Sequence, residues 1–161
     1  LVDDGLPTLA LAVDPRNNDL MRHRPRAKTA PIVDRGMKVI IGIVSGVTAI
    51  LALAVFLWAG GESALAFSRT MVFTLVAAST LIYVFSCRMM DRPLSVSSVF
   101  HNRWLLASVA AGFALQLFAV YHPWGNLAFG TVPIPWASWG VIFGASAVIV
   151  GMIEMTKRLT K

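Results

Sequence analysis

The chain has 161 residues, of which 57% are hydrophobic and only 14% are charged. Soluble domains carry about 25% charged and about 45–50% apolar residues, so the composition indicates lipid as the surrounding solvent. A net charge of +6 would suggest a nucleic-acid partner for a soluble protein. Here the basic residues gather at the ends of apolar segments, which is typical of membrane topology, so we expect the lipid bilayer and no nucleic acid as a partner.

The chain opens with an apolar stretch, residues 1–13, that contains Gly5 and Pro7. We expect the end of a membrane helix here, with a backbone that the glycine and the proline loosen so that carbonyl oxygens become free. Because the chain starts with Leu1 and its start resembles the inside of a protein, we expect the natural polypeptide to continue upstream. Residues 14–36 are polar and strongly basic, which predicts a cytoplasmic loop.

Four further stretches are long enough to span a bilayer, whose hydrocarbon core of about 30 Å requires roughly 20 helical residues. They cover residues 37–59, 63–87, 104–121 and 137–155. Backbone polar groups in lipid must be paired within their own segment, so these spans should be α-helices. The sequence thus predicts an all-α, polytopic membrane helix bundle. Four complete transmembrane helices (residues 37–155) follow the end of a fifth, and a cytoplasmic tail (residues 156–161) comes last.

The distribution of basic residues predicts the orientation. Of the 14 lysines and arginines, all but Arg69 fall in three regions that four spans place on one side, residues 16–38, 88–103 and 157–161. Positive charge collects in cytoplasmic segments, so we expect that side, with the C-terminus, to be cytoplasmic. Arg69 lies slightly inside the opposite interface, where we expect it to extend its guanidinium to water or to help close an exit path.

Asp3 and Asp4 are the most suggestive polar residues. A carboxylate at membrane depth is costly and generally faces a cavity, an ion or a partner. In a helix weakened by Gly5 and Pro7, it could offer a hard cation both carboxylate and backbone oxygens. Neighbouring helical residues point about 100° apart, so we expect only one of the two aspartates to face a given site. The alternative is that both lie hydrated at an interface.

Two other polar residues fall within or near the ends of the spans. Gln116 lies in mid-span and requires a partner, for which a bond to another helix is favoured over a role as a ligand. Glu154 is expected to pair with Lys157 or Arg158 at helical spacing. The three histidines are scattered and show no metal-ligand spacing.

The opening run Leu1-Val2-Asp3-Asp4-Gly5-Leu6-Pro7, continued to Pro15, resembles the sixth membrane helix of type II, calcium-type cation-transporting P-type ATPases. Further resemblances follow in collinear order, to the family's next cytoplasmic loop and to the starts of its eighth, ninth and tenth helices: residues 19–26, Ser68-Arg69-Thr70-Met71, residues 98–105, and residues 129–133 with Trp139. Together they cover essentially the whole chain. The topology of the family agrees with the charge distribution above.

The resemblance implies that Asp4 ligates the transported cation, most often calcium. The family often has threonine where this chain has Asp3, which would add a charge. Members with a second calcium site use an acidic or amide side chain in the eighth helix, where this chain has Thr80, and this favours a single site or another cation. Gly42 and Gly46 form a small-xxx-small pattern that allows close helix approach. Glycines of the family's seventh helix pack against the fifth, although this pair could also be incidental.

The catalytic parts of that family do not occur in this sequence. Neither the Asp-Lys-Thr-Gly run, whose aspartate is phosphorylated, nor a glycine-rich phosphate loop is present. We therefore expect no catalytic residue and no cofactor in this chain, with ATP and Mg²⁺ acting only in the missing part of a parent P-type ATPase. The family's fourth-helix Pro-Glu motif and its fifth helix are also absent, so the chain cannot complete a cation site alone.

The leading hypothesis is the membrane part of an ATP-driven cation pump, whose remaining helices and cytoplasmic domains are the partners. The alternative is a stand-alone, non-catalytic membrane subunit derived from such a pump, with a scaffolding or regulatory role in a larger complex. An unrelated four-helix channel or carrier is disfavoured because the four spans lack a polar stripe. The compact loops favour the plasma membrane of a prokaryote.

Overall fold

The structure, a computed structural model, describes the backbone of residues 2–12, 35–88 and 102–159, and the side chains of residues 5–12, 36–86 and 102–156. The described residues form helices and short connections, with no strand among them. In chain order the helices are α1 (Val2–Ala12), α2 (Arg35–Trp58), the 3-10 helix η2 (Gly61–Ala64), α3 (Leu65–Arg88), α5 (Arg103–Tyr121), α6 (Pro123–Phe129) and α7 (Trp136–Leu159).

Four of the described helical segments are long and apolar enough to cross a membrane: Gly36–Trp58, Gly61–Ser86, Arg103–Tyr121 and Trp136–Thr156. Their bounds agree with the predicted spans to within two residues at either end. The predicted all-α membrane bundle, with an additional helix before the four spans, is therefore confirmed. The predicted cytoplasmic loop and tail lie mostly outside the described residues.

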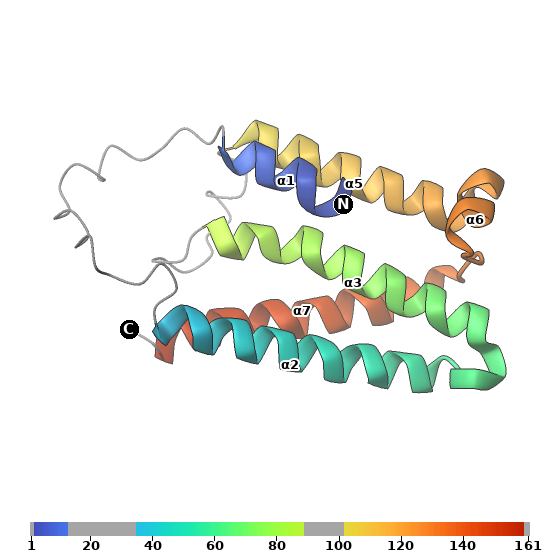
Figure 1. Cartoon of the computed structure of the whole chain (residues 1–161), viewed down its shortest axis with the longest axis horizontal. Coiled ribbons are helices and arrows are strands. Elements are labelled where there is room, and N and C mark those ends of the chain that lie inside the picture. Colours follow the sequence, from blue (N-terminus) through green and yellow to red (C-terminus); the bar gives the residue numbers. More distant parts are fainter. Residues whose placement is uncertain (1, 13–34, 89–101, 160–161) are drawn as a thin grey trace, which may run out of the picture.

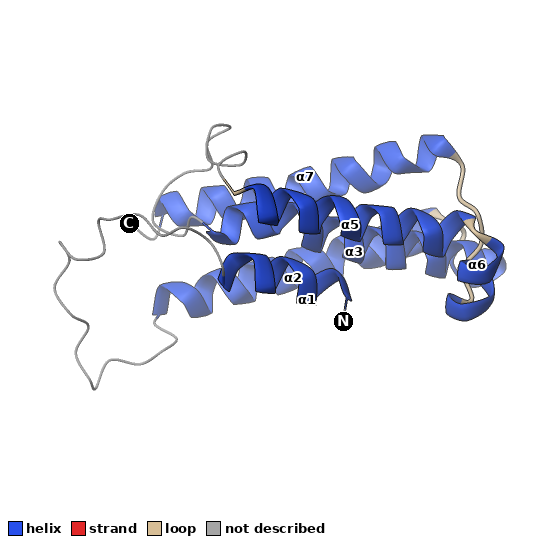
Figure 2. Ribbon diagram, turned by 90° about the horizontal axis from the view of Figure 1, so that it is seen from above, coloured by secondary structure: helices blue, strands red, loops and turns tan. Residues whose placement is uncertain are grey.

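The long helices run side by side, and α3 is the central one (Figure 1). It packs against α2, α7, α5 and α1. The helix α1 packs mainly against α5 and α3. Figure 2 shows the same bundle from above, with α6 beyond one end of α5. We call the end that carries α6 and the α2–α3 turn the hairpin end, and the opposite end, where α2 and α5 begin, the terminal end.

The core of the bundle is built on one face of α3. Met71, Leu75 and Ala78 are completely buried there, and they cluster with residues of α2, α5, α7 and the loop before α7: Val55, Ala59, Val120, Ile134, Trp139 and Ile142. Lipid tails are as apolar as these side chains, so helix association in a membrane depends on close packing and hydrogen bonds between helices. Shape complementarity along α3 therefore holds the bundle together.

A glycine pair reverses the chain between the first two spans. Gly60 and Gly61 both have positive φ angles, 108° and 55°, which side chains with a Cβ rarely adopt. The reversal brings α3 back alongside α2, and it fixes which faces of the two helices meet.

A hydrogen-bonded clamp fixes the loop between α6 and α7 at the hairpin end. The Thr131 hydroxyl donates to the carbonyl of Ala119 in α5 at 2.5 Å. The backbone N–H of the next residue, Val132, donates to the Thr70 hydroxyl in α3 at 3.0 Å. The loop thus ties α5 to α3, and we call these two bonds the hairpin-end clamp.

A second link at this end joins α5 to α7. The Tyr121 hydroxyl donates to the carbonyl of Ile134 at 2.8 Å and accepts a bond from the Trp139 indole N–H at 2.9 Å. The polar edges of both aromatic side chains are paired, so the rings can lie inside the bundle without unpaired groups.

Gly125 provides a test of how tightly α6 is seated. A Cβ added there would lie 2.3 Å from the carbonyl oxygen of Phe118 and 2.8 Å from Cα of Ala119. These are backbone atoms of α5, which cannot rotate away. We expect Gly125→Ala to destabilise the protein by about 1–3 kcal/mol, as overpacking of a filled site does, measured by thermal unfolding in detergent.

Gly140 in α7 is the matched control, because an added Cβ would meet nothing within 4 Å. Gly140→Ala should leave the unfolding midpoint unchanged or raise it slightly, since alanine favours a helix over glycine. Equal midpoints for the two variants would contradict the seating of α6 described here.

Candidate functional site

The helix α1 carries the two aspartates that the sequence singles out. Asp3 and Asp4 fall in its first turn, and their side chains lie outside the described ones. Pro7 lies inside the helix. Because proline has no N–H, it cannot donate the usual bond to the carbonyl four residues earlier, that of Asp3. The α1 backbone is helical in spite of Gly5 and Pro7, yet it holds one carbonyl without its intrahelical donor next to Asp4.

Contacts with the bundle fix the position of α1. Pro7 and Ala10, one turn apart, are buried, and the helix contacts α3 and α5. At its end, the Asn102 side-chain NH₂ donates to the carbonyl of Ala10 at 3.3 Å. The same side chain caps α5, since its oxygen accepts from the backbone N–H of Leu105 at 3.0 Å. One buried amide therefore ties α1 to the start of α5.

Sequence reasoning did not find Asn102, although the signal was there. Asparagine directly before an apolar helical run is a preferred N-cap. The second bond, to α1, joins residues far apart in the chain and could not be read from a local pattern.

Thr80 lies in the middle of α3, on a face that is only partly covered. Its hydroxyl donates to the carbonyl of Val76 at 2.9 Å, so its hydrogen is held by its own helix and its oxygen keeps a lone pair for another group. Because α1 and α3 are in contact, the helices that carry Asp4 and Thr80 are neighbours. Whether the two side chains share a site stays a prediction.

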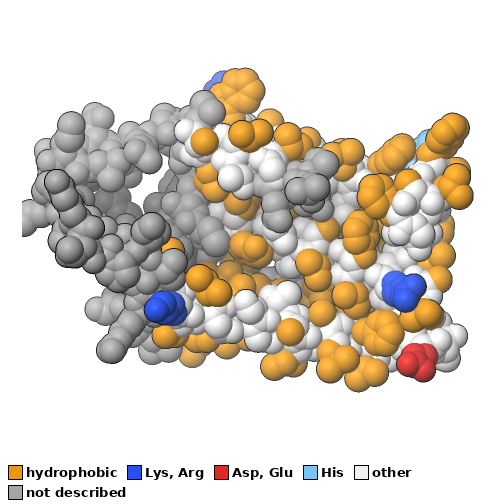
Figure 3. Space-filling view, in the orientation of Figure 1, with side chains coloured by type: hydrophobic (Ala, Val, Ile, Leu, Met, Phe, Trp, Pro, Cys, Tyr) orange, Lys and Arg blue, Asp and Glu red, His pale blue; other side chains and the backbone are white. Residues whose placement is uncertain are grey.

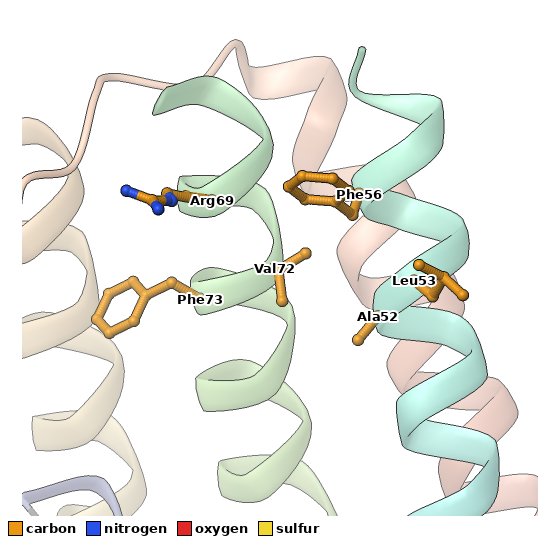
Figure 4. Close-up of a pocket in the computed structure, with 6 residues that line it drawn as sticks. All are labelled: Ala52, Leu53, Phe56, Arg69, Val72 and Phe73. Atoms are coloured by element: carbon orange, nitrogen blue, oxygen red, sulfur yellow. The ribbon is translucent and has the colours of Figure 1, made fainter. Parts of the chain in front are cut away.

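The face of the bundle seen in Figure 3 is mostly hydrophobic. Among the residues described, the charged side chains on this face lie only near the two ends of the bundle. A groove lies between α2 and α3. The groove has a volume of about 500 Å³ and is lined by Ala52, Leu53 and Phe56 of α2 and by Arg69, Val72 and Phe73 of α3. Figure 4 shows Val72 and Phe56 on the two sides of it, with the Arg69 side chain pointing sideways from α3, away from α2. Its lining offers no oxygen ligand, so the groove itself is not a cation site.

Gly42 and Gly46 lie on an exposed face of α2. A Cβ added to either would meet nothing within 4 Å. The described helices therefore do not use the small-xxx-small pattern, and its role as a packing surface stays a prediction. Among the residues described, no group of three or more His, Cys, Asp or Glu side chains could hold a metal ion. The carboxylates of Asp3 and Asp4 lie outside the described side chains.

At the terminal end, a polar link joins α3 to α7. The hydroxyl of Ser86, which is fully buried, donates to Oε1 of Glu154. This gives the carboxylate a partner that its spacing in the sequence did not predict. The expected pairing with Lys157 or Arg158 falls on side chains outside the described ones.

The Asn102 bridge can be tested by separating its two bonds. Asn102→Ala removes both of them, whereas Asn102→Asp keeps the oxygen that caps α5 and loses the NH₂ that bonds to α1. We expect faster amide hydrogen exchange in residues 2–12 for both variants. Exchange at the start of α5 should rise only in the alanine variant, which also loses about 1 kcal/mol of capping energy. Unchanged exchange in α1 for both variants would contradict the bridge.

Comparison with known proteins identifies the family of this chain. The family model described as "Cation transporting ATPase, C-terminus" matches residues 1–159. The chain is 34% identical over 151 residues to a calcium-transporting ATPase of Bacillus subtilis (strain 168), covering 92% of this chain and 17% of that protein. It is 25% identical over 177 residues to calcium-transporting ATPase 1 of Bacillus cereus, covering 100% of this chain and 20% of that protein.

A third relative, the probable cation-transporting ATPase F of Mycobacterium bovis, is 30% identical over 142 residues, covering 88% of this chain and 16% of that protein. These matches confirm the resemblance to the membrane region of cation-transporting P-type ATPases. The chain belongs to the family of cation-transporting ATPase C-terminal regions, and it is an integral membrane segment. It spans a fifth or less of the length of these relatives.

Proposed function

We propose that this chain is the membrane part of an ATP-driven cation pump, with calcium as the cation, and that it contributes one ligating carboxylate and the helices that support it. The observation that carries the proposal is Asp4 in α1, beside a carbonyl that Pro7 leaves without its helical donor. Calcium binds carboxylate and backbone carbonyl oxygens together. The names of two Bacillus relatives, both calcium-transporting ATPases, support the choice of cation.

Only one of the two aspartates faces the cation in this proposal, because adjacent residues leave a helix about 100° apart. We assign that role to Asp4. Asp3 adds negative charge nearby and contributes its backbone oxygen. Thr80 is the accessory group from α3, and its hydroxyl is a weaker ligand than a carboxylate because it is neutral. This favours one cation site.

The missing helices of the pump are the partners. The exposed face of α2 around Gly42 and Gly46 offers a surface on which another helix can approach closely, since neither glycine projects a side chain. In the proposed arrangement a helix from the upstream part of the pump packs there. ATP, Mg²⁺ and the phosphorylated aspartate act in that upstream part, so this chain has no catalytic residue of its own.

We place the terminal end of the bundle in the cytoplasm, in the plasma membrane of a prokaryote. All lysines and arginines except Arg69 fall in the segments that lead to or from that end, and positive charge favours the cytoplasmic side.

The decisive test uses the protein as its gene encodes it, in inverted membrane vesicles. Wild-type vesicles should take up ⁴⁵Ca²⁺ when ATP is added, and Asp4→Asn should reduce uptake at low calcium by at least about tenfold. The substitution removes the full negative charge of the proposed calcium ligand while it keeps the size of the side chain. Asp3→Asn should have a smaller effect.

Glu62→Gln is the control for general loss of negative charge, because Glu62 is exposed at the hairpin end, away from α1. It should transport like the wild type. Full transport by the Asp4→Asn variant would contradict the proposed ligand. An intact mass close to the 17.4 kDa of this chain for the natural protein would instead support the stand-alone subunit.

A further inference from the structure

Two polar groups in the middle of the bundle are buried without a hydrogen-bond partner. They are the hydroxyl of Thr74 in α3 and the side-chain NH₂ of Gln116 in α5. The two side chains are 0% and 2% exposed. An unpaired polar group away from water is destabilising, and two of them on neighbouring helices require an explanation.

Thr74 differs from six other hydroxyl residues in the described helices. These bond to a carbonyl of their own helix three or four residues earlier, which is the usual solution in lipid. They are Thr70, Ser79, Thr80, Ser108, Ser146 and Thr156. The Thr74 hydroxyl makes no such bond.

Both unpaired groups point into the same helix interface. A Cβ added at Gly112 of α5 would touch the Leu81 side chain of α3 at 2.6 Å, so these two residues mark the direction of contact. Gln116 is four residues after Gly112 and leaves α5 within about 40° of that direction, at about 100° per residue. Thr74 is seven residues before Leu81 and leaves α3 within about 20° of it.

The two groups also lie at similar depths. At about 1.5 Å per residue, Gln116 is about 6 Å and Thr74 about 10 Å further toward the hairpin end than Gly112 and Leu81. The two residues thus differ in depth by about 4 Å, a separation that one bridging water with a bond of about 2.8 Å to each group can span. The hairpin-end clamp, which holds Thr70 and Ala119, closes the interface above them.

We propose that a single water molecule is bound between Thr74 and Gln116. Its oxygen accepts from the Gln116 NH₂, and one of its hydrogens is donated to the Thr74 hydroxyl oxygen. Buried waters typically bond two to four polar groups that would otherwise be unpaired. The water site is independent of the proposed transport function.

The first test is density for the water in an experimental structure of the whole protein, at a resolution that shows ordered waters. A peak within hydrogen-bonding distance of both Thr74 Oγ1 and Gln116 Nε2 is the expected result. An empty interface, or a Gln116 amide that donates directly to the Thr74 hydroxyl, would overturn the proposal.

The second test measures coupling between the two residues by thermal unfolding. Thr74→Val and Gln116→Leu should each lower the midpoint by a few degrees, because each leaves the water and the other group short of a partner. The double variant should fall by about as much as the worse single variant, since groups that share one bridge are not additive. Fully additive shifts would contradict a shared water.

Ser68 provides the matched control. Its hydroxyl is also buried and unpaired, but Ser68, thirteen residues before Leu81, leaves α3 about 140° away from the Leu81 direction. Ser68→Ala should therefore combine additively with Gln116→Leu. If the Ser68→Ala and Gln116→Leu shifts are as non-additive as those of Thr74→Val and Gln116→Leu, the substitutions lower the stability of the bundle in general, and this would also contradict the shared water.

Discussion

The structure depends on one constraint: in lipid, polar groups must find their partners inside the protein. The four spans meet it for the backbone by being helical, and several of their hydroxyl side chains meet it by bonding to carbonyls of their own helices. The remaining polar side chains join helices to one another. Thr131 and Thr70 close the hairpin end, and Ser86 with Glu154 joins α3 to α7 at the other end.

The same constraint explains why α3 is the central helix. It is rich in small residues and in hydroxyl residues, several of which bond to carbonyls of their own helix, so four neighbours can approach it closely. Where it meets α5, the partner is Gly112, which gives the Leu81 side chain room. Packing on α3 and α5 then places α1, and Asn102 fixes the end of α1 to the start of α5. The candidate ligand helix is therefore positioned by the bundle.

The sequence predicted the four spans, because length and apolar composition are local signals. It also predicted that Gln116 needs a partner on another helix, yet that partner remained unknown. Contacts such as Asn102 with Ala10 depend on which helix faces become neighbours, and this is set by packing across the whole bundle. The role of Asp4 rests on the family resemblance and on Pro7, since the Asp4 side chain is outside the described ones.

Ligand chemistry shows why a site on α1 needs more than this chain. Calcium takes about six to eight oxygen ligands. In the proposed site, a carboxylate of Asp4, the backbone oxygen of Asp3 and the hydroxyl of Thr80 fall short of that number. The face of α2 that carries Gly42 and Gly46 is open and has no carboxylate among its exposed residues, so it can receive a helix but offers no charged ligand. In the proposed site the remaining oxygens come from helices outside this chain, and this division is how so apolar a bundle would contribute to a cation pump.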